Sequence, residues 1–165
     1  MKEKTFTVAG IEFIKFEEAD GKVIVVAKDE VFRSVYGKNN NLSKSEILER
    51  LQTEILPKIE EEVGAENVLE FETDLLSLDG LDTYGKVKSK ISIPTLDFYR
   101  KHARVFDKFK LDKYWWLATP WSTKEHYNNY YALCVSPDGD VYYSSYYGNF
   151  GVRPFLIFKS NIFES

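Results

Sequence analysis

The sequence has a single cysteine, Cys134, so no disulfide can form within the chain. It also lacks a long hydrophobic run, and no stretch approaches the roughly 20 residues that cross a bilayer as a helix. Residues 1–13 lack the apolar segment of a secretory signal peptide. We therefore expect a protein of the cytoplasm or a component of a virion, with no membrane partner.

The chain has no excess of positive charge. It contains 22 Lys and Arg against 26 Asp and Glu, which gives a net charge of −4. A dedicated nucleic-acid binder normally carries a basic face, so direct binding to nucleic acid is not expected. With 165 residues the chain is long enough to bury a sizeable core, and we expect one domain spanning residues 1–165.

The first part of the sequence predicts a hairpin followed by a helix. Residues 5–16 alternate apolar and polar side chains, a turn signal stands at 20–21, and residues 22–28 are a β-branched run typical of a buried strand, so residues 5–28 predict a hairpin. Ser43 and Glu46 have the spacing of a helix capping box, and the apolar residues that follow form one helical face. Pro57 should end or kink this helix, because proline lacks the N–H that a helix interior needs.

The middle of the chain is less regular. Residues 64–93 predict a covering loop with short pieces of structure, including a strand near Val68. Pro94 is well placed for the first turn of a second helix over residues 95–106, with His102 on its solvent side. The predicted apolar stripe of this helix consists of Ile93, Leu96, Tyr99 and Ala103.

The last third predicts a sheet built around a hairpin. Alternating residues predict a strand that ends at 119–120 and another over 130–136. Residues 136–139, Ser-Pro-Asp-Gly, have the composition of a tight turn with glycine in its left-handed position. A loop over 148–151 and a closing strand over 152–158 follow. The residues expected to form the buried frame are Trp115, Leu117, Leu133, Val135 and the closing strand.

The side chains around this hairpin have the composition of a binding surface. Tyrosine offers a rigid amphipathic contact, and serine and asparagine supply adaptable hydrogen bonds, as in antibody paratopes. Strand alternation cannot bury all of these tyrosines, and exposed aromatic patches mark binding sites. The alternative is that they only cover a twisted sheet. The predicted ligand-binding residues are Trp121, Tyr127, Asn128, Asn129, Tyr130, Tyr142, Tyr143, Ser145, Tyr146, Tyr147 and Asn149.

Three segments give the chain a resemblance to a known family. They are 114–120 (YWWLATP), 136–139 (SPDG) and 151–156 (GVRPFL). Together they resemble the bacterial and phage family called domain of unknown function 6273, although Ala118 stands where that family often has arginine. The resemblance implies an α+β, C-type-lectin-like fold, with two helices packed on a mainly antiparallel sheet that ends in a hairpin and a closing strand.

The same resemblance implies a non-enzymatic binding module for a protein or glycan ligand. The family is similar to the variable proteins of diversity-generating retroelements, whose terminal hairpin carries substitutable Tyr, Ser, Asn and Asp residues. The sequence lacks the Glu-Pro-Asn, Gln-Pro-Asp and Trp-Asn-Asp motifs of calcium-dependent sugar sites, and Cys134 alone cannot supply a formylglycine-generating centre. The aspartates of residues 74–82 lack the ligand spacing of a calcium loop. We expect no cofactor and no metal.

Individual residues in the last third have structural interpretations. Cys134 is expected to be a buried apolar residue, since free cysteine is usually buried. Arg153 is expected to pair with a carboxylate or with carbonyl groups while its stem packs. Gly151 is expected to permit an unusual backbone conformation.

Two other functions stay open from the sequence. The first is an inhibitor that uses acidic residues 46–74 to occupy the nucleic-acid groove of a host defence protein. Its acidic residues are Glu46, Glu49, Glu54, Glu60, Glu61, Glu62, Glu66, Glu70 and Glu72. The second is an enzyme that would use His126 beside Glu125, which is a weak pattern without a nucleophile and an orienting group. The sequence leaves the oligomeric state open.

Overall fold

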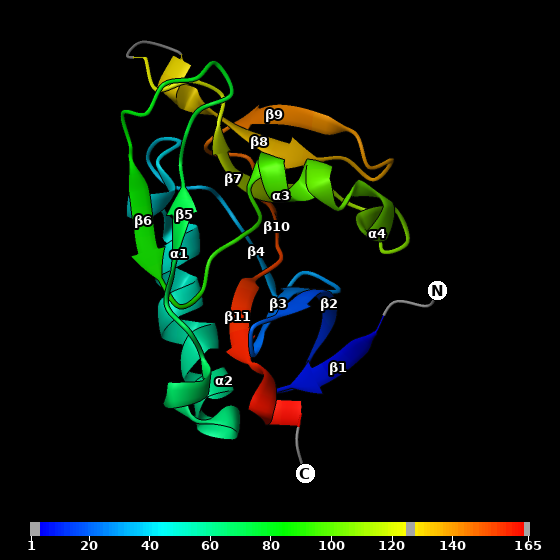
Figure 1. Cartoon of the computed structure of the whole chain (residues 1–165). Coiled ribbons are helices and arrows are strands. Elements are labelled where there is room, and N and C mark those ends of the chain that lie inside the picture. Colours follow the sequence, from blue (N-terminus) through cyan, green and yellow to red (C-terminus); the bar gives the residue numbers. More distant parts are fainter. Residues whose placement is uncertain (1–3, 125–127, 164–165) are drawn as a thin grey trace.

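The computed structural model describes residues 4–124 and 128–163. It shows an α+β protein with one main helix and three sheets that are mostly antiparallel. In Figure 1 the four-stranded sheet lies at the bottom and the five-stranded sheet at the top, with the main helix along one side of both.

The four-stranded sheet joins the beginning and the end of the chain. Its strand order is β1-β2-β3-β11, and all its pairings are antiparallel. The hairpin predicted over residues 5–28 is confirmed and is extended, because three strands form two successive hairpins. The strands are β1 Thr5–Val8, β2 Ile11–Ala19, β3 Lys22–Ala27 and β11 Phe155–Lys159.

The five-stranded sheet carries the predicted terminal hairpin. Its order is β4-β10-β7-β8-β9, and β10 runs parallel to β7. The turn at 136–139 joins β8 to β9 as predicted, with Gly139 at a φ of 89° and its N–H bonded to Ser136 O at 2.9 Å. The strands are β4 Phe32–Ser34, β7 Trp115–Pro120, β8 Tyr131–Val135, β9 Val141–Ser145 and β10 Phe150–Val152.

The single closing strand predicted over 152–158 is wrong. The chain instead forms β10 in one sheet and β11 in the other, and Arg153 and Pro154 make the crossing between them. Proline cannot donate to a ladder, so it is suited to this break. The carbonyl oxygen of Pro154 accepts a hydrogen bond from Ala27 N at 2.9 Å, which ties the crossing to β3. The predicted loop over 148–151 is correspondingly shorter.

Gly151 is needed for space rather than for an unusual backbone conformation. It is absent from the glycines of positive φ, and it lies within β10. A Cβ built on it would lie 2.8 Å from the Oε1 atom of Glu30. Glu30 is held there by Arg33, whose Nε donates to its carboxylate at 2.9 Å.

The main helix runs from Glu46 to Val63 through a π-helical turn. The prediction that Ser43 caps this helix is wrong, because Ser43 lies in a preceding 3₁₀ turn, Leu42–Lys44. Ser45 caps the helix instead, and its Oγ accepts from Leu48 N at 3.0 Å. The three parts are α1 Glu46–Arg50, the π-helical turn Leu51–Ile55 and α2 Leu56–Val63.

Pro57 does not end the helix. It lies in the first turn of α2, directly after the π-helical turn. A proline at such a position costs little stability, because the N–H group that it lacks would have no partner within α2. The wider turn before it gives the backbone the local adjustment that proline requires.

The irregular region predicted over 64–93 contains a small hairpin of its own. β5 (Phe71–Asp74) pairs antiparallel with β6 (Lys86–Ser89). A 3₁₀ turn, Ala65–Asn67, precedes it. β6 was not predicted, because its lysines alternate with too few apolar residues to resemble a buried strand.

The second helix begins at Leu96, close to the predicted start, but Pro94 precedes the capping residue instead of lying in the first turn. The helix is also broken in the middle. Thr95 caps it, its Oγ1 accepting from Phe98 N at 3.1 Å. His102 has non-helical torsions (φ −115°, ψ 27°) and separates α3 (Leu96–Lys101) from α4 (Ala103–Asp107). The break rotates the apolar stripe, so Ala103 is exposed and Phe106 is buried in its place.

The core has two buried clusters. The larger lies between the four-stranded sheet, the main helix and one face of the five-stranded sheet. The smaller lies between the other face of that sheet and the helices α3 and α4. The part of the predicted frame outside the closing strand is confirmed, because Trp115, Leu117, Leu133 and Val135 are all buried in the smaller cluster.

Candidate functional site

β9 is the outermost strand of the five-stranded sheet and lies along the upper margin of Figure 1. It is exposed to an unusual degree for an apolar strand: Val141, Tyr142 and Tyr143 are 40%, 48% and 52% exposed. Tyr147, just beyond the strand, is 64% exposed. These side chains place the most exposed part of the predicted surface on this strand and on the turn that follows it.

The two adjacent tyrosines of β9 belong to opposite faces of the sheet. Tyr143 lies opposite Leu133 of β8, and Tyr142 lies opposite Cys134. Successive side chains of a strand point to opposite faces, and directly opposed residues share a face. Tyr143 therefore shares the face that α3 and α4 cover, whereas Tyr142 shares the face of the larger core cluster.

The first of these surfaces, which we call the Trp121 face, consists of Trp121, Tyr131 and Tyr143. The rings of Trp121 and Tyr143 have centroids 4.5 Å apart, and those of Tyr131 and Tyr143 are 5.2 Å apart. Centroid distances of this size are typical of attractive aromatic pairs. The Trp121 face is thus a packed aromatic cluster at the rim of the smaller core.

The second surface, which we call the Tyr142 face, consists of Tyr114, Tyr142 and Phe150. Tyr114 stacks on Phe150 with centroids 5.3 Å apart and meets Tyr142 edge-on at 6.0 Å. Phe150 in turn packs on the buried Trp116 at 4.6 Å. The predicted tyrosines thus form two aromatic surfaces on either side of one edge strand.

Tyr130, Tyr146 and Tyr147 continue the aromatic surface past the end of β9. Tyr146 lies 5.2 Å from Tyr130 and 5.4 Å from Tyr147 by ring centroids. Its N–H donates to Tyr130 O at 2.8 Å, which extends the β8–β9 ladder by one pair. This backbone bond fixes the positions from which the three rings project.

The polar residues of the predicted surface are less prominent than its tyrosines. Ser145 and Asn129 are half-buried, and Asn149 is exposed while its carbonyl oxygen accepts from Arg33 Nη1 at 3.1 Å. Tyr127 and the side chain of Asn128 lie outside the described residues. The described part of the surface is therefore mainly aromatic.

Asn40 anchors the segment that carries Trp121 and Tyr131. This buried amide donates through Nδ2 to Ser122 O at 2.7 Å and to Tyr131 O at 2.9 Å. Its Oδ1 accepts from the hydroxyl of Tyr84 at 2.6 Å. A satisfied buried amide fixes the segments that it joins, so Asn40 sets the position of the Trp121 face from a distant loop.

Tyr114 and Tyr131 belong to the aromatic surfaces but were not among the predicted ligand-binding residues. Tyr131 immediately follows Tyr130, and Tyr114 lies two residues before the buried Trp116 on the same side of β7. The alternation of 114–120 contained this signal for Tyr114, since residues two apart in a strand share a face. Its exposure depends on the position of β9, which the sequence pattern does not give.

Arg153 is a structural residue rather than part of the surface. It is fully buried, and it donates from Nε to Ala27 O at 3.0 Å and from Nη2 to Lys28 O at 2.9 Å. Its guanidinium lies 4.7 Å from the ring of Trp115. Burial lowers the pKa of Arg153 to about 10, and its partners are carbonyl groups, one of the two kinds that the sequence predicted.

Metal-binding side chains do not gather in the part of the chain that the structure describes. The described residues hold no group of three or more His, Cys, Asp and Glu side chains placed to bind a metal. Burial raises the pKa of the Cys134 thiol to about 12, so it stays protonated at neutral pH. His126 and Glu125, the candidate catalytic pair, lie outside the described residues.

His102 is not the solvent-facing residue that the sequence predicted. Its ring packs on Phe16 and Phe98, and its Nε2 lies 2.7 Å from the carboxylate of Glu17. The hydrogen bond with His102, followed by that with Lys101, lowers the pKa of Glu17. This pair joins β2 to the second helix.

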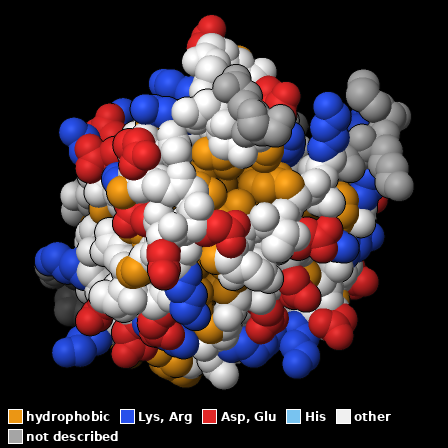
Figure 2. Space-filling model, turned by 90° about the horizontal axis from the view of Figure 1, so that it is seen from below, with side chains coloured by type: hydrophobic (Ala, Val, Ile, Leu, Met, Phe, Trp, Pro, Cys, Tyr) orange, Lys and Arg blue, Asp and Glu red, His pale blue; other side chains and the backbone are white. Residues whose placement is uncertain are grey.

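The negative charge of the acidic segment 46–74 is partly neutralised by basic residues within it and from the strand β6 and its C-terminal neighbour. Glu60 pairs with Lys90 at 2.9 Å, and Glu54 pairs with Arg50 at 2.8 Å. Across the small hairpin, Glu72 lies opposite Lys88. Figure 2, which shows the molecule from below, likewise shows Lys and Arg interspersed with Asp and Glu around a hydrophobic area.

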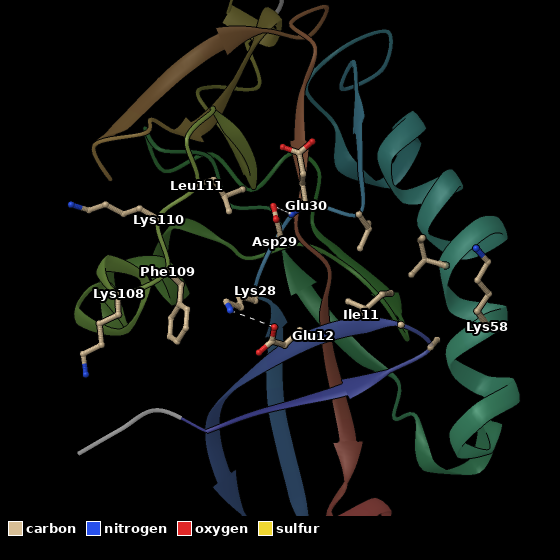
Figure 3. Close-up of a pocket in the computed structure, with 14 residues that line it drawn as sticks. Ile11, Glu12, Lys28, Asp29, Glu30, Lys58, Lys108, Phe109, Lys110 and Leu111 are labelled. Atoms are coloured by element: carbon tan, nitrogen blue, oxygen red, sulfur yellow. Dashed lines mark hydrogen bonds and ion pairs between the residues drawn. The ribbon is translucent and has the colours of Figure 1, made fainter.

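A large cleft lies away from the tyrosine surfaces. It has a volume of about 590 Å³ and lies between the β1–β2 turn, the segment after β3, the main helix and residues 108–111. Figure 3 shows Lys28 directed at Glu12, at 3.4 Å, whereas Lys108 and Lys110 extend outward from the opposite wall. The lysines labelled in Figure 3 do not point toward a common place in the cleft.

Comparisons with protein-family models, with curated proteins and with solved structures gave no match. Within the described part of the chain, no helix is both long and apolar enough to span a membrane.

Proposed function

We propose that this chain is a non-enzymatic binding module that uses the aromatic surfaces at β9 to bind a protein. The observation that carries the proposal is the exposure of Tyr142, Tyr143 and Tyr147, which are about half exposed or more at one edge of a rigid sheet. Tyrosine is enriched among the residues that dominate binding energy in protein interfaces. The frame behind the surface is buried and hydrogen-bonded, so little ordering is needed on binding.

A protein ligand fits this surface better than a glycan. Sites for small ligands are usually concave. None of the predicted residues lines the cleft beside Glu12, the cavity beside Leu76 or the cavity beside Phe6. Trp121 packs against Tyr143 with ring centroids 4.5 Å apart, which leaves less of its ring available to stack on a sugar. Exposed aromatic side chains are enriched at the centre of protein interfaces, so these surfaces are better suited to a protein ligand.

We further propose a C-type-lectin-like fold, as the resemblance to domain of unknown function 6273 implies. The order of opening strands, main helix, second helix and terminal hairpin supports it. The acidic-inhibitor function has less support, because lysines and arginines lie beside the acidic residues that it would need.

Site-specific cross-linking tests the proposal. A photoreactive phenylalanine analogue replaces Tyr147 in one variant and Phe163, an exposed aromatic residue of the C-terminal 3₁₀ turn Ser160–Phe163, in a control. In a bacterial lysate, position 147 should cross-link a discrete protein that position 163 does not, and Tyr142→Ala should abolish that product. Equal cross-linking at both positions contradicts the proposal, and so does binding to a glycan array without any protein product.

A further inference from the structure

The outer edge of β9 carries backbone groups that can pair with another strand. Ser136 N donates to Asp140 O at 2.9 Å, and Tyr146 N donates to Tyr130 O at 2.8 Å. Hydrogen-bonded pairs alternate along an antiparallel ladder, so these two bonds fix the pattern between them. By this pattern the backbone N–H and C=O groups that point away from β8 belong to Val141, Tyr143 and Ser145.

Two other sheet edges, β4 and β11, are protected in ways that β9 is not. β4 is short and carries Arg33, and β11 is covered by bridges from Val68 and Ser92. β1 is shorter than β9, and its exposed side chains are threonines. Charges, short length and coverage are the usual devices against edge pairing. β9 (VYYSS) has no charge and no proline, and no strand of the described residues lies beyond it.

We infer that β9 pairs antiparallel with β9 of a second copy of this chain, around a two-fold axis at Tyr143. In this register Tyr143 lies opposite Tyr143 of the second copy, and Val141 lies opposite Ser145. Tyr143 exchanges two backbone hydrogen bonds with its counterpart, and Val141 O accepts from Ser145 N of the second copy. The carbonyl oxygen of Ser145 already accepts from Gly148 N at 3.0 Å and from Ser144 Oγ at 3.2 Å, so it adds no bond to the interface. The two five-stranded sheets become one continuous sheet, and the contact is the same on both copies, as a two-fold interface requires.

The charges at the ends of β9 favour this second copy in this orientation. Asp140, which precedes the strand, lies opposite Tyr146 of the second copy, so the two Asp140 carboxylates lie at opposite ends of the interface. A parallel pairing would place them side by side, where they would repel. The strand between is neutral, so it meets its own copy without repulsion.

The pairing also places two aromatic surfaces next to each other. Directly opposed side chains share a face, so the two Tyr143 side chains lie next to each other, each on the Trp121 face of its own copy. The Trp121 faces of the two copies then form one surface across the axis. The inference does not require the proposed ligand, because it concerns the chain alone.

The purified protein tests this inference without any ligand. Sedimentation equilibrium from micromolar to near-millimolar concentration should give twice the mass of one chain. Tyr143→Lys places two like charges opposite one another and should shift the protein to monomer. Tyr142→Lys is the matched control, because its lysine lies opposite Ser144 of the second copy, and it should remain dimeric.

A charge swap separates loss of pairing from loss of folding. Tyr143→Lys and Tyr143→Glu chains should each be folded monomers by circular dichroism and should form a heterodimer when mixed. A wild-type protein that stays monomeric overturns the inference, and so does a Tyr143→Lys protein that remains dimeric. Folded variants that fail to associate on mixing overturn it too. None of these outcomes bears on protein capture at Tyr147, so the proposed function stands or falls separately.

Discussion

The ring of Trp121 packs on the ring of Tyr143, with centroids 4.5 Å apart and an interplanar angle of 38°. This contact joins the segment that follows β7 to the outermost strand of the sheet. Tyr143 is nevertheless about half exposed, so the same ring has a buried side that packs and a free side available for contact. One side chain thus belongs both to the framework and to the exposed aromatic surface.

Tyr143→Ala should lower the free energy of unfolding by about 1 kcal/mol, because it removes the aromatic contacts with Trp121 and Tyr131. Tyr147→Ala, which removes a more exposed ring, should change it by less than about 0.5 kcal/mol. Urea denaturation followed by far-ultraviolet circular dichroism measures both. Equal losses for the two variants would contradict the packing described for Tyr143.

Arg153→Lys should destabilise the protein more than Arg153→Met. The lysine keeps a buried charge but loses the forked hydrogen bonds to Ala27 and Lys28 and the contact with Trp115, so we expect a loss of about 3 kcal/mol. Methionine fills similar space without a charge, and the loss should be about 1–2 kcal/mol.

The control for Arg153 is Arg100→Lys, which changes an exposed ion pair with Asp97 and should cost less than about 0.5 kcal/mol. Urea denaturation at neutral pH gives all three values. If Arg153→Lys is as stable as the wild type, the buried guanidinium does not hold the crossing between the sheets.

The pair formed by Glu17 and His102 should make the stability of the fold depend on pH in the acidic range. The hydrogen bond with His102 lowers the pKa of Glu17 below its ordinary value of 4.5. A carboxyl whose pKa is lower in the folded state stabilises the fold above its unfolded pKa, and this contribution is lost as pH falls through the folded pKa. Stability should therefore decline as pH falls below about 4.5.

Glu17→Gln isolates that contribution. The variant should be less stable than the wild type at pH 6, and the difference should shrink as the pH falls toward 3. Thermal melts over this pH range measure it, with Glu18→Gln, on the same strand, as the control. A difference that stays constant with pH would show that the Glu17 carboxylate has no special partner in the fold.

Cys134 should not react with thiol reagents in the folded protein. It is buried against the larger core, and burial raises its thiol pKa to about 12, so almost no thiolate forms at pH 8. Iodoacetamide labelling at pH 8, read by mass spectrometry, should be complete only in denaturant. Rapid labelling without denaturant would show that β8 opens readily.

Asn40→Ala should loosen the segment that carries the Trp121 face. The change leaves the carbonyl groups of Ser122 and Tyr131 and the hydroxyl of Tyr84 without this partner, and it should cost about 2 kcal/mol. Hydrogen exchange should increase in the segment around Ser122 and at the start of β8. Exchange that increases evenly over the whole chain would indicate only a general loss of stability.

Local pattern was sufficient for features that depend on neighbouring residues. The turn at 136–139 needs proline and a left-handed glycine, and both occupy the places that the turn requires. The alternation around Trp115 and Leu133 identified the buried frame, because a strand with one core face repeats every two residues. Thr95 and Pro94 marked the start of the second helix for similar reasons.

Other features depend on partners far away in the sequence, and only the folded chain supplies them. The closing strand divides because β3 and β7 lie in different sheets and each pairs with its own part of it. His102 becomes half-buried because Glu17, on β2, lies beside it. The lysines of β6 reduce the net negative charge around the acidic segment, because the pairing of β5 with β6 brings them beside it.

The tyrosines of β9 show the same division. Alternation alone places Tyr142 and Tyr143 on opposite faces, since adjacent residues of a strand must point in opposite directions. It cannot show that both faces are open, because that depends on β9 being the last strand of its sheet and on α3 and α4 covering only part of one face. Composition therefore indicated a binding surface, and tertiary packing divided it into the Trp121 face and the Tyr142 face.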